Sequence, residues 1–264
     1  MKRMFKIFIL LFVFASQSLL AEQDISDEAF KAYKKGEKLY QTKKYDEALK
    51  WFKISFDEDS SKDLAFNIGL TYDELKDYPN AIKWYRKAFE MGDKKGGANL
   101  GLLYDEKLKD YPKAIKWYKK AIKKGNVSAI NNLAILYKQQ KDYPNAIKWY
   151  KKAFEMGNLD GAYNLGCLYD VNKKDFKNAI IWYKKAAKKG HKKAINNLGE
   201  VYHDLKDNIT ASAYVLAGIV YGYDKQETFK YLNKTWKIDE PTMIKAYKLQ
   251  QTLDIPKHYI GDID

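Results

Sequence analysis

The chain has 264 residues, of which 48 are Lys or Arg and 34 are Asp or Glu, so its formal net charge is +14. The only cysteine is Cys167, which excludes an intrachain disulfide framework. The lysine excess suggests anionic partners. An AT-rich genome would also explain it, because Asn, Ile and Tyr are abundant as well.

Residues 1–21 have the pattern of a secretory signal peptide. A basic start is followed by a short apolar run at 7–14, and Ala21 offers a small residue for cleavage. An uncleaved anchor is the alternative, but the apolar run is too short to span a bilayer comfortably. We therefore expect a periplasmic or secreted protein without a transmembrane segment.

Residues 22–224 contain a repeated block. The copy Asp77–Tyr85 is followed by others at 110–118, 142–150 and 175–183 and preceded by a worn copy at 44–52. The block's tryptophan recurs at steps of 33, 33, 32 and 33 residues. A fixed period of this length predicts stacked helix pairs. We expect an all-α superhelical solenoid of about six helix-turn-helix repeats.

The block predicts the second helix of each pair. In residues 81–89 the apolar side chains lie on one helical face, and lysines and Arg86 lie on the other. Asp77 is placed to cap this helix, Pro79 suits its first turn, and Gly92 is expected to end it.

An upstream motif, Asn-Leu-Gly with a later tyrosine, predicts the first helix. A glycine inside a helix costs roughly 1 kcal/mol against alanine, so its recurrence at one phase indicates close helix packing. We expect the glycines to meet small residues of the second helix, namely Ala81, Ala114, Ala146 and Ala179.

Residues 225–254 predict two C-terminal helices that cap the array. Asp239 and Pro241 form a good start for the last of them, and Pro256 ends it. Residues 255–264 are expected to form a flexible tail.

These motifs resemble two related repeat families. Six residues hold the relative spacing of the tetratricopeptide signature: Ile68, Gly69, Tyr72, Ala81, Tyr85 and Ala88. The Trp-Tyr-x-Lys-Ala ending with a glycine stop resembles the Sel-one-like repeat instead. From Gly69 to Ala81 is 12 residues, whereas from Gly101 to Ala114 is 13. The resemblance implies the solenoid fold and a protein-interaction scaffold as the function.

A narrower resemblance is to the Helicobacter cysteine-rich protein family, which consists of exported Sel-one-like arrays. The positions that match its paired cysteines hold other residues here: Phe89, Gly97, Ile122, Ile130, Phe154, Ala162, Ala187 and Ile195. Relatives there have been linked to penicillin binding and β-lactam hydrolysis, so that activity is an alternative implied by the resemblance.

The residues themselves do not predict catalysis. No serine has a lysine three positions on, as serine β-lactamases require, and Lys234-Thr235 is followed by Trp236. His191, His203 and His258 are scattered, which disfavours a zinc site. We expect no enzyme, cofactor or metal, and we interpret His191 as a cation that follows a helix-ending glycine.

The first helices are expected to line a concave groove, on which acidic and aromatic side chains recur at fixed offsets from the motif glycine. The predicted groove residues are Tyr33, Glu37, Phe66, Asp73, Glu74, Asp105, Glu106, Asn131, Tyr163, Asp170, Asn196, Glu200 and Asp204. Because the groove reverses the sign of the chain, we expect it to bind a protein or peptide bearing Lys or Arg. Nucleic acid would fit the net charge, but the expected export argues against it, and we expect a monomer. The plainer interpretation is that these acids keep the first helices soluble and pair with lysines.

The exposed side of the second helices has the opposite character and is rich in lysine. A second alternative is therefore an anionic envelope-surface binder that uses this convex face.

Overall fold

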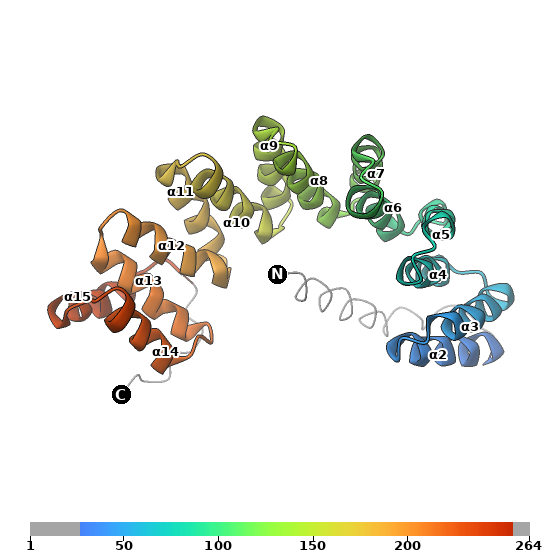
Figure 1. The fold of residues 1–264 in the computed structure, drawn as a ribbon, viewed down its shortest axis with the longest axis horizontal. Coiled ribbons are helices and arrows are strands. Elements are labelled where there is room, and N and C mark those ends of the chain that lie inside the picture. Colours follow the sequence, from blue (N-terminus) through green and yellow to red (C-terminus); the bar gives the residue numbers. More distant parts are fainter. Residues whose placement is uncertain (1–26, 256–264) are drawn as a thin grey trace. The chain divides into compact units, whose positions relative to one another are not determined.

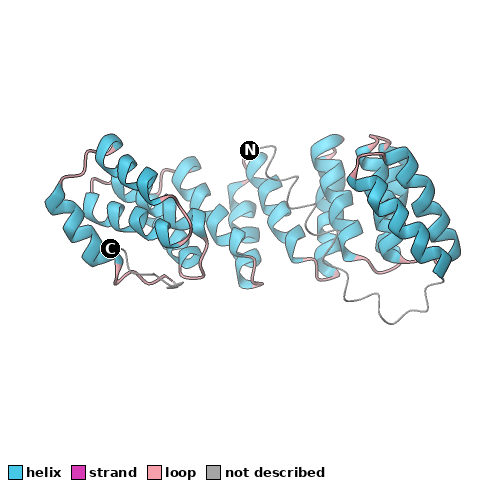
Figure 2. Cartoon of the chain, turned by 90° about the horizontal axis from the view of Figure 1, so that it is seen from below, coloured by secondary structure: helices cyan, strands magenta, loops and turns pink. Residues whose placement is uncertain are grey.

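The computed structural model describes residues 27–255, and every regular element in that range is a helix (Figures 1 and 2). The first helices of the repeats are α2 (Asp27–Gln41), α4 (Lys62–Glu74), α6 (Lys94–Leu102), α8 (Val127–Gln139), α10 (Leu159–Cys167) and α12 (Lys192–Asp204). The second helices are α3 (Tyr45–Glu58), α5 (Tyr78–Glu90), α7 (Tyr111–Lys123), α9 (Tyr143–Glu155), α11 (Phe176–Ala187) and α13 (Asn208–Val220). The predicted all-α repeat fold is confirmed.

The chain divides into two compact units, and the division falls between Gly96 and Gly97 inside α6. Unit 1 holds α2 to α5. Unit 2 holds α7 to α13 and continues into α14 (Lys225–Lys230), the π-helical turn η4 (Tyr231–Thr235) and α15 (Glu240–Gln250). The predicted signal peptide, residues 1–21, and the predicted tail beyond residue 255 lie outside the described residues.

The second helices begin as the sequence predicts. The Asp77 carboxylate accepts a hydrogen bond from the Asn80 N–H at 3.2 Å, and the aspartates before α7, α9, α11 and α13 cap in the same way. Gly92 has a φ of +98°, as expected for a helix-ending glycine.

A feature missed by the sequence analysis is the lysine before the N-cap residue of each second helix, which is Lys44 for α3 and an aspartate for the others. Its backbone lies in the left-handed region at Lys43, Lys76, Lys109, Lys141, Lys174 and Lys206, with φ between 52° and 65°. An L-residue there costs about 1 kcal/mol.

The extra residue in the 13-residue spacings is accommodated by a π-helical turn. α6 continues into η2 (Leu103–Lys107), and α10 continues into η3 (Leu168–Asn172). A π turn closes one residue later than an α turn, as the bond from the Leu108 N–H to the Leu103 carbonyl at 3.1 Å shows. The inserted residue is thus absorbed at the end of the first helix.

The motif glycines Gly69, Gly101 and Gly166 make room for an aromatic ring, whereas Gly199 meets Val215. A Cβ on Gly101 would lie 2.4 Å from Tyr118 Cδ1, and a Cβ on Gly166 would lie 2.4 Å from Tyr183 Cδ1. Both tyrosines are fully buried. The prediction that Ala114 and its equivalents lie nearest the glycines is therefore wrong: the ring four residues further along the second helix takes that position.

Most of these buried tyrosines have a carboxylate partner. The Tyr118 hydroxyl donates to Asp105 Oδ2 at 3.4 Å, and the Tyr183 hydroxyl lies 3.3 Å from Asp170 Oδ2. The repeat of Tyr150 differs, because Lys138 occupies the equivalent position. The Tyr150 hydroxyl is buried and has no hydrogen-bond partner among the described residues.

This difference predicts opposite effects of the same substitution. Tyr118→Phe should lower the free energy of unfolding by about 1 kcal/mol, because it removes a buried hydrogen bond. Tyr150→Phe should leave the free energy of unfolding unchanged or raise it by up to about 1 kcal/mol, because it removes an unpaired buried hydroxyl. Urea denaturation at pH 7 measures both values, and equal losses would contradict the assignment.

Aromatic rings also join consecutive second helices. In unit 1 the Phe56 and Trp84 rings meet edge to face at 5.1 Å, and in unit 2 the Phe154 and Trp182 rings meet at 6.1 Å. Trp182 packs against two hydrophobic clusters, one that reaches from α10 to α13 and one that reaches from α8 to α10. The recurring tryptophan therefore holds neighbouring repeats together.

The C-terminal helices close unit 2. α15 packs on α13, and Leu232 and Ala246 are buried in the same hydrophobic cluster. The chain then turns back, so that Lys188 Nζ lies 2.8 Å from Asp254 Oδ2.

Candidate functional site

The candidate site is the side of unit 2 formed by α8, α10 and α12, which we call the first-helix face. It carries the predicted groove residues Asn131, Tyr163, Asp170, Asn196, Glu200 and Asp204. Five other predicted residues, Tyr33, Glu37, Phe66, Asp73 and Glu74, belong to unit 1. Asp105 and Glu106 lie in the π-helical turn η2 of unit 2.

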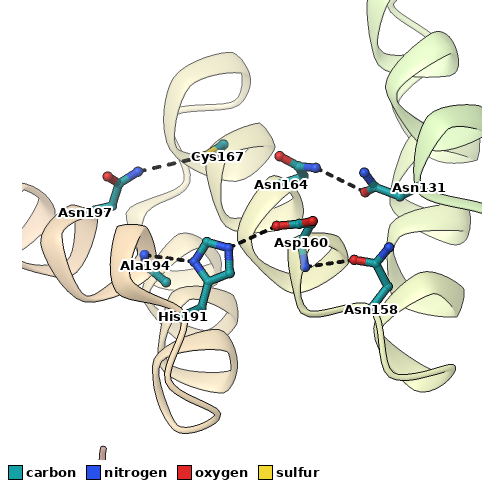
Figure 3. A network of polar contacts seen from close by, with 8 residues as sticks. All are labelled: Asn131, Asn158, Asp160, Asn164, Cys167, His191, Ala194 and Asn197. Carbon is teal, nitrogen blue, oxygen red and sulfur yellow. Dashed lines mark hydrogen bonds and ion pairs between the residues drawn. The ribbon is translucent and has the colours of Figure 1, made fainter. Parts of the chain in front are cut away.

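Asparagines bridge neighbouring first helices (Figure 3). Asn164 Nδ2 of α10 donates to Asn131 Oδ1 of α8 at 3.1 Å. One repeat later, Asn197 Nδ2 of α12 donates to the Tyr183 hydroxyl at 3.0 Å and lies in hydrogen-bonding reach of Tyr163. The asparagine two residues before the motif glycine thus fixes the register between repeats.

His191 lies on the same face, at the N-terminal end of α12. Its Nδ1 accepts the Ala194 N–H at 3.2 Å and caps α12, while Nε2 lies 3.2 Å from Asp160 Oδ1 (Figure 3). Since Nδ1 accepts a backbone N–H, the ring proton lies on Nε2, which donates to Asp160. The His191 ring stacks on Tyr163 with centroids 4.6 Å apart.

The hydrogen bonds of His191 determine the charges of His191 and Asp160. Its interpretation as a cation after a helix end is wrong, because the ring caps the start of α12, where an acceptor is needed. The hydrogen bond from His191 lowers the pKa of Asp160, so this exposed carboxyl is ionised at neutral pH.

The predicted carboxylates of unit 2 are not equally available to a partner. Asp105 is 6% exposed and accepts from Tyr118, so it is a buried internal acceptor. Asp170 is half-buried and engaged by Tyr183. Glu106 and Asp204, in contrast, are exposed. The predicted acidic groove residues of unit 2 are therefore a mixture of buried and exposed carboxylates.

The C-terminal segment covers the last part of the face. The Tyr231 hydroxyl donates to Glu200 Oε1 at 3.0 Å, and the Trp236 ring stacks on His203 at 4.1 Å. A partner that binds this face would therefore contact a Glu200 carboxylate that already accepts a hydrogen bond from Tyr231.

The predicted residues of unit 1 make local contacts. The Tyr33 hydroxyl donates to Glu37 Oε1 at 3.3 Å, and the Phe66 ring packs 5.7 Å from that of Tyr85. Asp73 lies 3.4 Å from the Tyr85 hydroxyl, whereas Glu74 is exposed.

Burial gives Asp105 a measurable pH signature. Desolvation raises the pKa of its carboxyl and nearby Glu106 adds to the effect, although Lys109 and the Tyr118 hydrogen bond oppose it. Because the pKa of Asp105 in the folded state lies above the unfolded value of about 3.9, its contribution to stability is fully present below that pH. This contribution is lost as pH rises through the pKa of the folded state.

We therefore expect Asp105→Asn to gain stability relative to the unmodified protein as pH rises from 4 to 7. The asparagine keeps an oxygen that can accept from Tyr118 and carries no charge. Urea denaturation at both pH values gives the difference in free energy of unfolding. A difference that shrinks toward pH 7 would contradict the buried-acceptor role.

The sequence analysis missed Asn164, Asn197 and His191 as site residues. A signal was present for the asparagines, because every copy from Asn67 onward has Asn two residues before the glycine or its alanine substitute. His191 stands where Asn126 and Asn158 cap earlier first helices, so the position rather than the residue type identified its role.

Residues 27–255 contain no group of three or more His, Cys, Asp and Glu side chains arranged to hold a metal ion. In the same range no helix has the length and apolarity needed to cross a membrane.

The comparisons with protein families agree with this geometry. The Sel1 repeat model matches residues 20–60, 98–126 and 159–191, and tetratricopeptide repeat models match 63–91 and 127–158. The chain is a repeat protein of the Sel1 and tetratricopeptide type. Repeats of this type are known for protein–protein interaction and are typically non-enzymatic. None of the curated proteins matches the chain.

Solved structures share the fold. A protective antigen of uropathogenic Escherichia coli, c5321, which displays a Sel1-like repeat fold, is 27% identical over 78% of this chain, with a TM-score of 0.56. The chain spans about half, 48%, of that antigen. A Sel1 repeat protein from Oxalobacter formigenes is 25% identical, with 84% of this chain and 93% of that one covered and a TM-score of 0.53. PilF of Pseudomonas aeruginosa, 16% identical over 87% of this chain and 100% of its own, with a TM-score of 0.57, shows the fold alone.

Proposed function

We propose that unit 2 binds an extended segment of a partner protein along its first-helix face. The observation that supports this most is the series of amide side chains across α8, α10 and α12, in which half-exposed Asn164 donates to buried Asn131 (Figure 3) and Asn196 and Tyr163 are half-exposed. A carboxamide both donates and accepts hydrogen bonds, so it can pair with either group of a peptide backbone.

Charge determines which segment is proposed. The Asp160 carboxyl is ionised, and Glu106 and Asp204 are exposed on the same unit. These acids favour a segment with Lys or Arg, while Tyr163 offers an apolar ring surface. Because Asp105 and Asp170 accept from tyrosines, we assign recognition to the exposed acids and the amides instead.

Selection from a random 12-residue peptide library displayed on phage tests the proposal. We expect peptides enriched in Lys or Arg whose affinity falls about tenfold or more on Asn196→Ala with Asp204→Asn, which alter half-exposed and exposed side chains. Lys148→Ala, on the opposite side of unit 2, is the matched control and should leave affinity unchanged. If the affinity of the selected peptides is unchanged by Asn196→Ala with Asp204→Asn but falls with Lys148→Ala, binding at the first-helix face is refuted.

Export is part of the proposal, and it rests on the basic and apolar pattern of residues 1–21. Amino-terminal sequencing of the protein recovered from a bacterial host should start at residue 22.

The enzymatic alternative has no support beyond the resemblance, and a nitrocefin turnover assay on the purified protein checks it.

A further inference from the structure

Three second helices of unit 2, α7, α9 and α11, carry mostly positive charge. Residues 111–124, 143–156 and 176–189 contain 14 lysines and one acid, Glu155, and all 14 lysines are exposed. The first helices in 127–139, 159–172 and 192–204 contain three lysines and four acids. If the lysines only reflected a lysine-rich composition, the first and second helices would contain similar numbers of them. The unequal distribution of lysine is therefore a property of the surface formed by α7, α9 and α11.

These helices follow one another along one side of unit 2 (Figure 1). We call this side the second-helix face. α9 and α11 are in direct contact there, because the Phe154 and Trp182 rings meet edge to face. Their lysines therefore belong to one continuous surface.

Aromatic rings on this face are covered by lysines of the protein itself. Lys185 Nζ lies 4.1 Å from the Trp182 ring centroid, Lys120 Nζ lies 4.2 Å from that of Trp117, and Lys189 Nζ lies 5.6 Å from that of Phe154. A cation held over a ring is positioned without an acidic partner and keeps its charge available for an external anion.

We propose that the second-helix face of unit 2 binds the surface of a bilayer rich in anionic phospholipids. The inference goes beyond the proposed peptide binding and uses the opposite side of the unit. A lipid surface requires only many exposed positive charges, each of which contributes to adsorption.

Two features favour lipid over other polyanions. The three helices contain no arginine, whereas bidentate recognition of nucleic-acid phosphates favours arginine. Their rings are capped by ammonium groups, whereas single-stranded nucleic acid requires free rings on which bases stack.

Vesicle sedimentation with residues 22–264 tests the proposal. Vesicles of phosphatidylcholine with 30% phosphatidylglycerol should bring down the protein at 0.1 M NaCl, and vesicles of phosphatidylcholine alone should not. Raising NaCl to 0.5 M should release it, because salt screens exposed charges. Equal binding to both vesicle types would overturn the proposal.

Matched triple variants locate the face. Lys116→Gln, Lys119→Gln and Lys148→Gln remove three charges from the second-helix face, and we expect a loss of about a hundredfold in the partition coefficient, or about fivefold per lysine. Lys138→Gln, Lys192→Gln and Lys193→Gln remove the same charge from the first helices and should lower the coefficient less than threefold. Equal losses in the two triples would show a response to net charge and overturn the assignment.

Thermal melts confirm that both triples are folded before binding is compared. Binding to a soluble polyanion, heparin or duplex DNA, is compared with binding to the anionic vesicles. A protein that binds the polyanion and does not bind the vesicles would refute the lipid assignment. Failure of the peptide selection leaves this experiment unaffected, because the two use opposite sides of unit 2.

Discussion

Tyr183→Ala is expected to lower the free energy of unfolding by about 3–5 kcal/mol, the range for deleting a fully buried aromatic ring. The ring is fully buried against Gly166, and its hydroxyl lies 3.3 Å from Asp170 and accepts from Asn197. Removing it leaves a cavity between α10 and α11 and breaks the bridge to α12. Denaturant unfolding measures the loss.

Tyr183→Phe and Gly166→Ala separate the two contributions. Tyr183→Phe keeps the ring and should cost only about 1–2 kcal/mol for the lost polar contacts. Gly166→Ala should destabilise the unmodified protein by about 1–3 kcal/mol, because its Cβ would lie 2.4 Å from Tyr183 Cδ1. In the Tyr183→Ala background that cost should disappear, and additive effects would contradict ring-over-glycine packing.

Trp117→Ala is the second large effect, with an expected loss of about 3–5 kcal/mol. The indole is 7% exposed on α7, and Lys120 lies over it at 4.2 Å. Because stacked repeats stabilise their neighbours, the loss should spread into α8. Amide hydrogen exchange should show faster exchange in α8 as well as in α7.

Lys120→Gln is the control for Trp117→Ala, because it removes the ammonium and keeps the ring. The control should cost less than about 1 kcal/mol. Protection that falls in α7 alone, with α8 unchanged, would contradict coupling between the repeats.

The helix pairs could be predicted because their signals are local and repeated. Asp77 and Gly92 mark the start and end of a helix by backbone chemistry alone, and the structure places both as expected. The glycine of the first helix was also recognised as a close approach. The side chain that approaches this glycine is set by the rotation of one helix against the other, which the spacing of residues does not give. For this reason the sequence predicted Ala114 next to Gly101, whereas the structure has Tyr118 there.

The site was predictable to a smaller extent. Offsets from the motif glycine found residues of the first helices, yet they did not separate Asp105, a buried acceptor for Tyr118, from its exposed neighbour Glu106. That distinction depends on a partner 13 residues away on another helix. His191 was misread for a similar reason, because its cap and its stack on Tyr163 arise from the meeting of two repeats.

Photo-crosslinking tests the central claim, that a partner segment lies on the first-helix face of unit 2, most directly. Benzoylphenylalanine is placed either at position 196, replacing Asn196 of α12, or at position 148, replacing Lys148 of α9, and each protein is irradiated with a library-selected peptide. The account predicts a crosslink from position 196 and none from position 148. A crosslink from position 148 alone would place the partner on the other side of the unit and contradict it.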